Sequence, residues 1–227
     1  TGTLNVAIGV SSLYANTTAG NNTAVGFNSL NATTTGGSNT TVGKDSLKAN
    51  TTGSSNNAVG VVALEANTTG VGNVAMGNNA LRANTTASNN TGVGHIALMD
   101  NTTGASNTAV GASSLANNTT GHSQTAVGFE ALKTITTAPG STAVGCAALK
   151  LNTAGDNTAV GSDALTTNSD GGGLVAIGAA CLKVNTTASS NTGVGTTCLR
   201  YNTTGADNTA MGYRSMMSNT TGANNTS

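Results

Sequence analysis

Aromatic residues are nearly absent from this 227-residue sequence, which has two phenylalanines, three tyrosines and no tryptophan. Without aromatic rings there is no stacking platform for single-stranded nucleic acid or for sugars. Any hydrophobic core must therefore be thin and built from Val, Leu and Ala. This absence argues against large aromatic-lined binding sites.

Charged residues are also scarce: they make up 7% of the chain, and eight cations balance eight anions. A neutral chain of this kind offers no basic face for nucleic acid. No apolar run approaches the ~18 residues of a membrane span, and no signal peptide is visible. We therefore expect neither nucleic-acid binding nor a membrane span.

The three cysteines do not form a disulfide framework, because their number is odd. Cys181 and Cys198 hold the same place in neighbouring repeats, where parallel stacking would bring their Cα atoms to ~4.8 Å. In-register side chains keep the Cβ atoms farther apart than a disulfide prefers. We predict that both are free, small core residues, and Cys146 has no partner.

Candidates for catalysis or metal binding are few. His95 and His122 are the only histidines, and both fall at variable positions that favour a solvated surface. No spacing supports a Ser-His-Asp or Cys-His arrangement, and the aspartates are too irregular for a repeating calcium site. The sequence thus predicts no catalytic residue, no cofactor and no metal, and the protein is not expected to be an enzyme.

What the sequence does contain is a 17-residue unit that occurs thirteen times. Its anchor is Val, Ile or Met followed by glycine. The interval between these repeat glycines is 17 residues everywhere except from Gly145 to Gly161, where it is 16. The repeat glycines are Gly9, Gly26, Gly43, Gly60, Gly77, Gly94, Gly111, Gly128, Gly145, Gly161, Gly178, Gly195 and Gly212.

A leucine follows each repeat glycine by four residues, with Met216 in this place in the last unit. These leucines are Leu13, Leu30, Leu47, Leu64, Leu81, Leu98, Leu115, Leu132, Leu149, Leu165, Leu182 and Leu199. The residue before each leucine is small, and charges fall at the variable positions, which are therefore expected to face water. A fixed short period of this kind indicates a stacked, quasi-one-dimensional fold.

The period predicts an all-β fold, a parallel β-solenoid of thirteen coils. Seventeen residues are too few for a helix-turn-helix repeat, which needs ~33. The repeat glycine and the Asn-Thr-Thr-Gly run mark two turns in each coil. They leave two extended segments, N-T-A-V and A-L-x-x, which favours a flattened roll, although x-x-A-L-x-x could also form one helical turn.

Stacking would place equivalent asparagines above one another as ladders, which hold the turns together. One ladder contains Asn5, Asn22, Asn39, Asn56, Asn73, Asn90, Asn107, Asn157, Asn191, Asn208 and Asn225. The other contains Asn16, Asn50, Asn67, Asn84, Asn101, Asn118, Asn152, Asn168, Asn185, Asn202 and Asn219. The missing residue near Asp156 falls in a variable turn, where its loss should not shift the core.

Adjacent apolar residues suggest a partner chain. In an extended segment neighbours point to opposite faces, so Ala24 and Val25 should not share one core, nor should Ala63 and Leu64. One apolar face is then left for another chain, and closed rotational symmetry is the usual solution. We also expect residues 1–227 to be one domain, a slice of a longer repeat array without caps.

Units such as Asn107-Thr108-Ala109-Val110-Gly111, followed by a small-Leu pair and Asn-Thr-Thr-Gly, resemble the repeats of phage-type tail-fibre proteins. More distantly they are similar to the head repeats of YadA-like trimeric autotransporter adhesins, whose repeat is shorter. The resemblance covers the whole chain. It implies a left-handed parallel β-roll, trimeric about its long axis and exposed on a cell or virion surface, with no catalytic residues.

Two features of the Asn-Thr-Thr runs allow other interpretations. The Asn-x-Thr triplets, such as Asn84-Thr85-Thr86, are formally glycosylation sequons, but the pattern is more typical of a turn. A threonine column, which includes Thr51 and Thr68, could order water and bind ice. Its place at a turn argues against that role.

We expect the chain to be the shaft or head of an extracellular surface fibre that mediates attachment. The alternatives are a solenoid that binds ice or a polysaccharide surface, and a subunit of a self-assembling filament. The expected partners are further copies, with a trimer favoured, and a cell-surface receptor or glycan bound by regions outside this segment. The glycine and leucine ladders are the residues on which this hypothesis depends.

Overall fold

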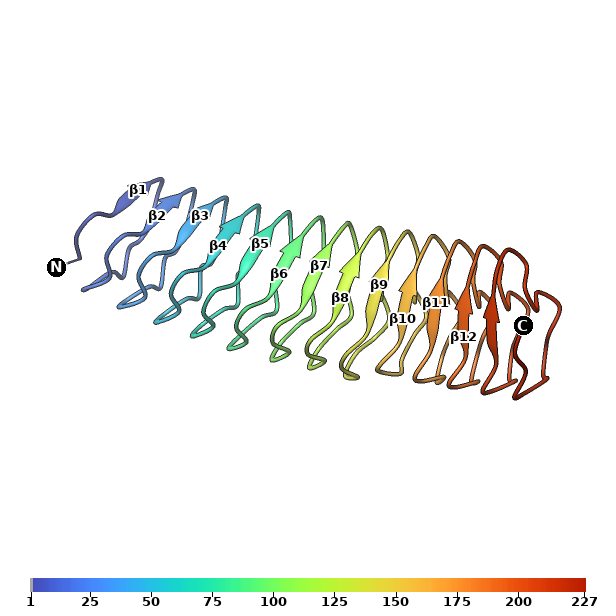
Figure 1. The fold of residues 1–227 in the computed structure, drawn as a ribbon. Helices are drawn as coiled ribbons and strands as arrows, with labels where there is room; N and C mark the ends of the chain where they lie inside the picture. The colour runs from blue at the N-terminus through green and yellow to red at the C-terminus, as the bar shows by residue number, and fades with distance from the viewer. Residues whose placement is uncertain (1) are drawn as a thin grey trace. The chain divides into compact units, whose positions relative to one another are not determined.

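The computed structural model describes residues 2–227, and these contain thirteen short β-strands and no helix (Figure 1). The expected all-β parallel solenoid is confirmed. The chain divides into two compact units, Thr1–Thr120 and Gly121–Ser227. Each unit is built from the same repeat, and we call one repeat a coil.

The first unit contains seven strands. They are β1 (Val6–Ile8), β2 (Thr23–Val25), β3 (Thr40–Val42), β4 (Asn57–Val59), β5 (Val74–Met76), β6 (Thr91–Val93) and β7 (Thr108–Val110). Each pairs in parallel with the next, and Ala58 lies opposite Ala75, one repeat further on. One short strand per coil therefore builds a parallel sheet in chain order.

The second unit repeats this arrangement with six strands. They are β8 (Thr125–Val127), β9 (Thr142–Val144), β10 (Thr158–Val160), β11 (Val175–Ile177), β12 (Thr192–Val194) and β13 (Thr209–Met211). Between β9 and β10 the register is kept, with Ala143 opposite Ala159, although this coil is one residue short. The turn around Asp156 absorbs the missing residue, as predicted.

Each strand is followed directly by its repeat glycine, which the backbone requires for two reasons. Gly178 has φ of +133°, a conformation that residues with a side chain rarely adopt. A Cβ atom at this position would also lie 2.5 Å from the carbonyl of Gly195 in the next coil. Neighbouring coils can stack this closely because both positions lack a side chain.

The segment after the glycine corrects one prediction, because it forms turns rather than a second extended segment or a helical turn. Val62 and Leu64 have φ of 52° and 54°, in the left-handed region. The residues of such a segment do not alternate between two faces, so Ala63 and Leu64 are both fully buried. The expectation that they face opposite sides was wrong, because it assumed extended backbone.

This turn segment is also bonded to the coils on either side of it. The amide of Leu64 donates to the carbonyl of Ala80 in the next coil at 2.9 Å. The amide of Val62 donates to the backbone carbonyl of Lys44 in the preceding coil at 3.0 Å. Hydrogen bonds therefore run along the stack on the turn side as well as on the strand side.

The core of each coil consists of the central strand residue, the small residue and the leucine. Ala58, Ala63 and Leu64 have no exposed surface, and every repeat leucine from Leu30 to Leu199 is equally buried. A left-handed conformation costs a leucine roughly 1–2 kcal/mol, whereas its burial contributes ~1.5–3 kcal/mol. Burial of each leucine thus offsets the backbone strain at that residue.

The two asparagine ladders are buried and bonded along the stack. Asn67 Nδ2 donates to Asn50 Oδ1 at 3.0 Å and to the Gly70 carbonyl at 3.1 Å. In the other ladder, Asn39 donates from its backbone to Asn22 Oδ1 at 2.9 Å. Each amide closes its own turn and joins it to the next, as the stacked sequence pattern predicted.

Candidate interaction surface

A column of exposed and half-buried apolar side chains lies on the outer face of the strands, at the residue before each repeat glycine. We call this column the outer ridge. It consists of Ile8, Val25, Val42, Val59, Met76, Val93 and Val110 in the first unit, and of Val127, Val144, Val160, Ile177, Val194 and Met211 in the second. Every member is Val, Ile or Met, and Val42 and Met76 are 41% and 46% exposed.

The position after the repeat glycine widens this apolar surface in some coils. Val10, Phe27, Val61, Phe129 and Tyr213 all occupy it and are exposed. Both phenylalanines of the chain are therefore on the surface. This column was not predicted from the sequence, although these residues share one repeat position, directly after the repeat glycine.

A parallel sheet with such a face is expected to be covered. Parallel sheets occur with both faces packed, and contiguous exposed apolar patches mark interaction sites. The inner face here is covered by the turn segment: Ser46 Oγ donates to the Ala58 carbonyl at 2.9 Å. The prediction that neighbouring apolar residues point to opposite faces is confirmed for one pair. Ala24 is buried, whereas Val25 lies on the outer ridge and is partly exposed.

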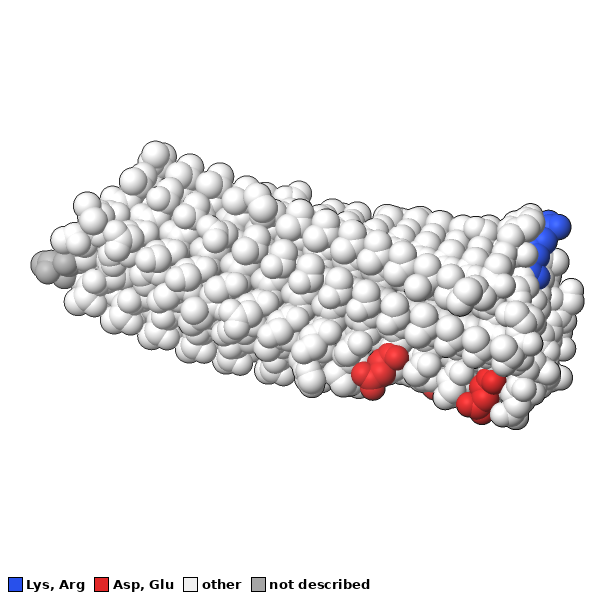
Figure 2. All heavy atoms as spheres, viewed as in Figure 1, with Lys and Arg blue, Asp and Glu red and all other residues white. Residues whose placement is uncertain are grey.

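A second column runs beside the outer ridge, two residues earlier in each strand. It is threonine in most coils, for example Thr23, Thr40 and Thr108, and these side chains are exposed or half-buried. The outer strand face therefore presents the pattern Thr-x-Val, repeated at the stacking distance of ~4.8 Å. The face viewed in Figure 2 carries few charged side chains.

The threonine column of the Asn-Thr-Thr turns has a different role. The hydroxyl of Thr51 donates to the carbonyl of Thr68 at 3.1 Å, and the hydroxyl of Thr68 donates to the carbonyl of Thr85 at 3.1 Å. These hydroxyls bond to the backbone of the next coil. The adjacent threonines, such as Thr52 and Thr69, are exposed.

Several asparagines of the Asn-Thr-Thr triplets, which are formally sequons, lie inside the coil. Asn67, Asn84 and Asn185 have no exposed surface, and their side-chain amides donate hydrogen bonds within the ladder. An enzyme that attaches a glycan needs access to this nitrogen. In the folded chain these positions serve as turn residues.

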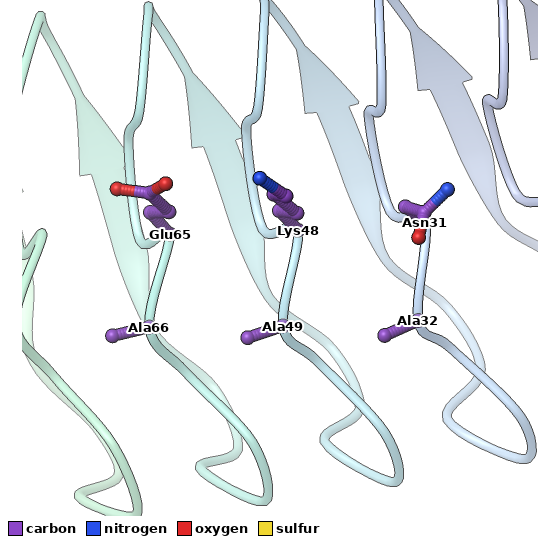
Figure 3. A pocket seen from close by; sticks show the side chains of 6 residues that line it. All are labelled: Asn31, Ala32, Lys48, Ala49, Glu65 and Ala66. Atoms are coloured by element: carbon purple, nitrogen blue, oxygen red, sulfur yellow. The ribbon is translucent and has the colours of Figure 1, made fainter.

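A shallow groove of about 430 Å³ lies on the turn side of the first unit (Figure 3). Its lining residues come in pairs from three successive coils: Asn31 and Ala32, Lys48 and Ala49, and Glu65 and Ala66. The alanine methyl groups line up along the stack, and the longer side chains form one wall. The positive charge of Lys48 and the negative charge of Glu65 offset each other there.

Ion pairs on the turn side involve neighbouring coils. Glu130 contacts Lys133 Nζ at 2.6 Å and Lys150 Nζ at 2.7 Å. Hydrogen bonds from Lys133 and then Lys150 lower the pKa of the Glu130 carboxyl from its ordinary value. Conversely, the hydrogen bond with Glu130 raises the pKa of Lys150.

Asp45 is the exception to the expectation that the charged positions face water. It is 8% exposed and accepts a hydrogen bond from Asn28 at 3.0 Å. Burial acts to raise the pKa of Asp45, but the hydrogen bond from Asn28 and the charge of Lys48 outweigh it and lower the pKa. A charge is tolerated here because amide and ammonium groups compensate it.

The cysteines and histidines lie where the sequence predicted. All three thiols are free, with Cys146 exposed and Cys181 and Cys198 buried. Burial, followed by the neighbouring Cys198, raises the pKa of Cys181 to about 12. His95 and His122 are exposed.

A compensating glycine accommodates Cys181. On β12, Gly193 takes the place that alanine holds in most strands. A Cβ atom there would lie 2.6 Å from the sulfur of Cys181. The paired change explains how a larger atom fits a core built for alanine and serine.

No group of three or more His, Cys, Asp or Glu side chains in residues 2–227 is arranged to hold a metal ion. The same residues include no helix that is long and apolar enough to cross a membrane. No known protein family matches the sequence, and neither the curated proteins nor the solved structures contain a significant match.

Proposed function

We propose that this chain is a structural segment of an extended surface fibre, in which several copies associate through the outer ridge. The observation that carries the proposal is that ridge. Its position is apolar in all thirteen coils, although it lies on the outside of a single chain. A sheet face that stays exposed to solvent would carry polar side chains at some of these positions.

The mechanism is mechanical. Hydrogen bonds join neighbouring coils at the strand, at the turn segment and at both asparagine ladders, so the stack resists bending. Burial of the outer ridge between copies would add about 25 cal/mol for each Å² of apolar surface. Stacked coils of this kind would hold terminal binding modules away from the surface that bears them, and several copies would give avidity.

The resemblance to trimeric fibre repeats favours three copies around one long axis. Closed cyclic symmetry places the same face of every copy toward the axis, which would cover the apolar position that recurs in every coil. A fibre of this type acts outside the cell or on a virion. Its receptor or glycan would be bound by regions outside residues 1–227.

Paired variants of the first unit test the proposal. The ridge variant carries Val42→Asp and Met76→Asp, and the control carries Thr52→Asp and Thr69→Asp in the exposed turn column. Both add two charges to exposed positions of the single chain. Sedimentation should show that the ridge variant dissociates while the control keeps the mass of the wild type.

Equal masses for the two variants would contradict the proposal, because the ridge would then not be the contact. Circular dichroism at the same concentrations shows whether each variant keeps its β-structure. A folded ridge variant of lower mass is the expected result.

The outer strand face also favours a second candidate, the binding of ice. Its Thr-x-Val columns combine a hydroxyl and a methyl group at regular spacing on a parallel sheet, whereas the Asn-Thr-Thr column uses its hydroxyls on the backbone. Ice binding needs this face free, and association of copies covers it. Thermal hysteresis of a monomeric preparation would support this candidate, and its absence would exclude it.

A further inference from the structure

The turn side of the first unit carries charges that alternate in sign from coil to coil. Lys48, Glu65 and Arg82 each lie five residues after a repeat glycine, in three successive coils. The next coil has Met99 at this position and Asp100 directly after it. We call Lys48, Glu65, Arg82 and Asp100 the alternating row, and its signs are plus, minus, plus and minus in chain order.

Three of these four charges have no ion pair within the chain. Among residues 2–227, the ion pairs do not include Glu65, Arg82 or Asp100. Arg82 is exposed, and the two carboxylates are half-buried. Lys48 contacts Asp45 at 3.4 Å, but 43% of the Lys48 side chain is still exposed. The row can therefore meet charges from outside the chain.

Small apolar groups lie beside the alternating row. Ala32, Ala49 and Ala66 line the groove of about 430 Å³, and all three are half-buried (Figure 3). Ala83 holds the same position in the following coil and is equally half-buried. Methyl groups allow another surface to approach closely, and the groove leaves room for a longer apolar side chain.

The alternating row is complementary to itself when two copies run in opposite directions. A two-fold axis perpendicular to the stack, between the coils of Glu65 and Arg82, sets each of these residues opposite the other one in the second copy. The same axis sets Lys48 of each copy opposite the coil of Asp100. All four charges then face the opposite sign, because both copies share the coil spacing of ~4.8 Å.

We propose that a second copy of the chain binds the turn side of the first unit in the antiparallel direction, through the alternating row and the alanine groove. The same two-fold axis brings Met99 of each copy level with Lys48 and Ala49 of the other, at the middle of the groove. Met99 is half-buried in the single chain. Its flexible, apolar side chain is suited to fill such a gap.

The signs select this register and direction over the alternatives. A shift of one coil sets Glu65 opposite Glu65 and Lys48 opposite Arg82, and two parallel copies in register also match each charge with its own kind. Parallel copies shifted by one coil pair three charges of each row instead of four. Like charges in contact are strongly unfavourable, whereas exposed ion pairs contribute little. The row therefore sets the register, and burial of apolar groups in the groove supplies most of the affinity.

The antiparallel contact goes beyond the proposed association through the outer ridge and does not depend on it. The alternating row lies on the turn side, whereas the outer ridge lies on the strand face (Figure 3). Copies that associate through the ridge keep their turn sides free. The contact would then join two fibres that run in opposite directions, rather than the copies within one fibre.

Exchange of two charges tests the contact. The parent chain carries the ridge substitutions Val42→Asp and Met76→Asp, which remove the proposed ridge contact. In this parent we compare Glu65→Lys, Arg82→Glu and the two together. Each single substitution places two pairs of like charges across the two-fold axis, and the combination restores opposite signs.

Sedimentation equilibrium should show that the parent forms dimers and that each single variant associates about tenfold more weakly. The combination should return to within about threefold of the parent. An equimolar mixture of the single variants should do the same, because each offers the charge that the other lacks. Unchanged association of the single variants would overturn the inference, as would a combination that is no better than either one.

The matched control carries Thr69→Lys and Thr86→Lys, which change the net charge as much as Glu65→Lys does. Both threonines are exposed on the Asn-Thr-Thr turns. The control should associate within about twofold of the parent, because it leaves the alternating row unchanged. A control that weakens association as much as Glu65→Lys would overturn the inference, because net charge alone would then explain the effect.

Met99 tests the groove itself. Met99→Ala should weaken dimerisation of the parent about fivefold, since it removes the apolar group that fills the groove. Met99→Leu keeps that bulk and should stay within about twofold. Circular dichroism shows whether each chain is folded. Equal association of the folded Met99→Ala and Met99→Leu chains would overturn the role of the groove.

The ridge substitutions separate the failure of this contact from the failure of the proposed function. A folded parent that is monomeric at every concentration overturns the antiparallel contact and leaves the association through the outer ridge intact. If the parent keeps the mass of the wild type and Glu65→Lys lowers it, the antiparallel contact stands and the ridge contact fails. In the wild type, Glu65→Lys alone should halve the mass reached at high concentration.

Discussion

Each coil places a leucine in a left-handed backbone conformation that leucine rarely adopts elsewhere. Leu64, Leu98 and Leu182 have φ of 54°, 51° and 49°, and all three are fully buried. The conformation turns the chain so that the leucine and the small residue before it enter the same core. The strain is kept because the amide of each leucine bonds to the next coil, as for Leu64 and Ala80.

The unusual backbone conformation of the repeat glycines could be predicted from the sequence, but that of the leucines could not. A glycine at every seventeenth position indicates a backbone requirement, and Gly111, with φ of +133°, meets it. Leucine has no preference for the left-handed region, so nothing in the residue type announces that conformation. It is imposed by the stacking of coils, which local propensity does not describe.

The repeat glycines can be tested by one substitution in the second unit. Gly178→Ala should lower the free energy of unfolding by about 3 kcal/mol, since it combines backbone strain with a clash against Gly195. Unfolding in urea, followed by circular dichroism, measures the change.

Gly173→Asn is the matched control. Gly173 has φ of +66°, and Asn89 holds the same place in its coil with φ of 61°. The free energy of unfolding of the Gly173→Asn variant should stay within about 0.5 kcal/mol of that of the wild type. Equal effects of the two substitutions would contradict the close stacking of the repeat glycines.

Equivalent residues of successive coils stack as ladders, and the two asparagine ladders are the most polar of these. In each ladder, buried amides that would be costly alone satisfy one another in the next coil. The sequence predicted the ladders because both asparagines recur at the repeat period. It did not predict the turn segment, because residues such as Ala63 and Leu64 fit a strand, a helix or a turn equally well.

Removal of one amide tests the ladder. Asn67→Ala removes the donor to Asn50 Oδ1 and the acceptor that Asn84 Nδ2 uses at 3.0 Å. The free energy of unfolding should fall by about 2–3 kcal/mol. Asn117→Ala, at an exposed position, is the control and should change it by less than about 0.5 kcal/mol. A similar loss in both variants would show that the ladder has no special role.

The ion pairs between coils predict a dependence on pH. Lys133 and Lys150 lower the pKa of Glu130 from its ordinary value of 4.5, so the unfolded chain binds this proton more readily than the folded chain. The resulting stabilisation is complete above pH 4.5 and is lost as the pH falls through the lower, folded pKa.

Glu130→Gln isolates this contribution. The melting temperature of the wild type should exceed that of the variant at neutral pH, and the difference should shrink as the pH falls below 4.5. Scanning calorimetry at several pH values measures it. A difference that persists unchanged in acid would show that the charge of Glu130 does not stabilise the fold.

At the scale of the whole molecule, the main question is which faces of the coils stay exposed in a single copy. The sequence predicted that one apolar face would stay on the outside of the chain, and the outer ridge is such a face, with Val42 and Met76 as examples. That a partner chain covers it stays a prediction. The same reasoning failed for the turn side, where the leucines are buried within their own chain.

We propose that a single copy of the chain leaves its outer ridge uncovered, and the mass of the wild type in solution is the first quantity to measure. Light scattering over a range of concentrations should give a stable multiple of the 21.9 kDa chain, with three copies as the expected number. A folded protein that keeps a mass of 21.9 kDa at every concentration would contradict the account. The outer ridge would then be a surface for something other than another copy.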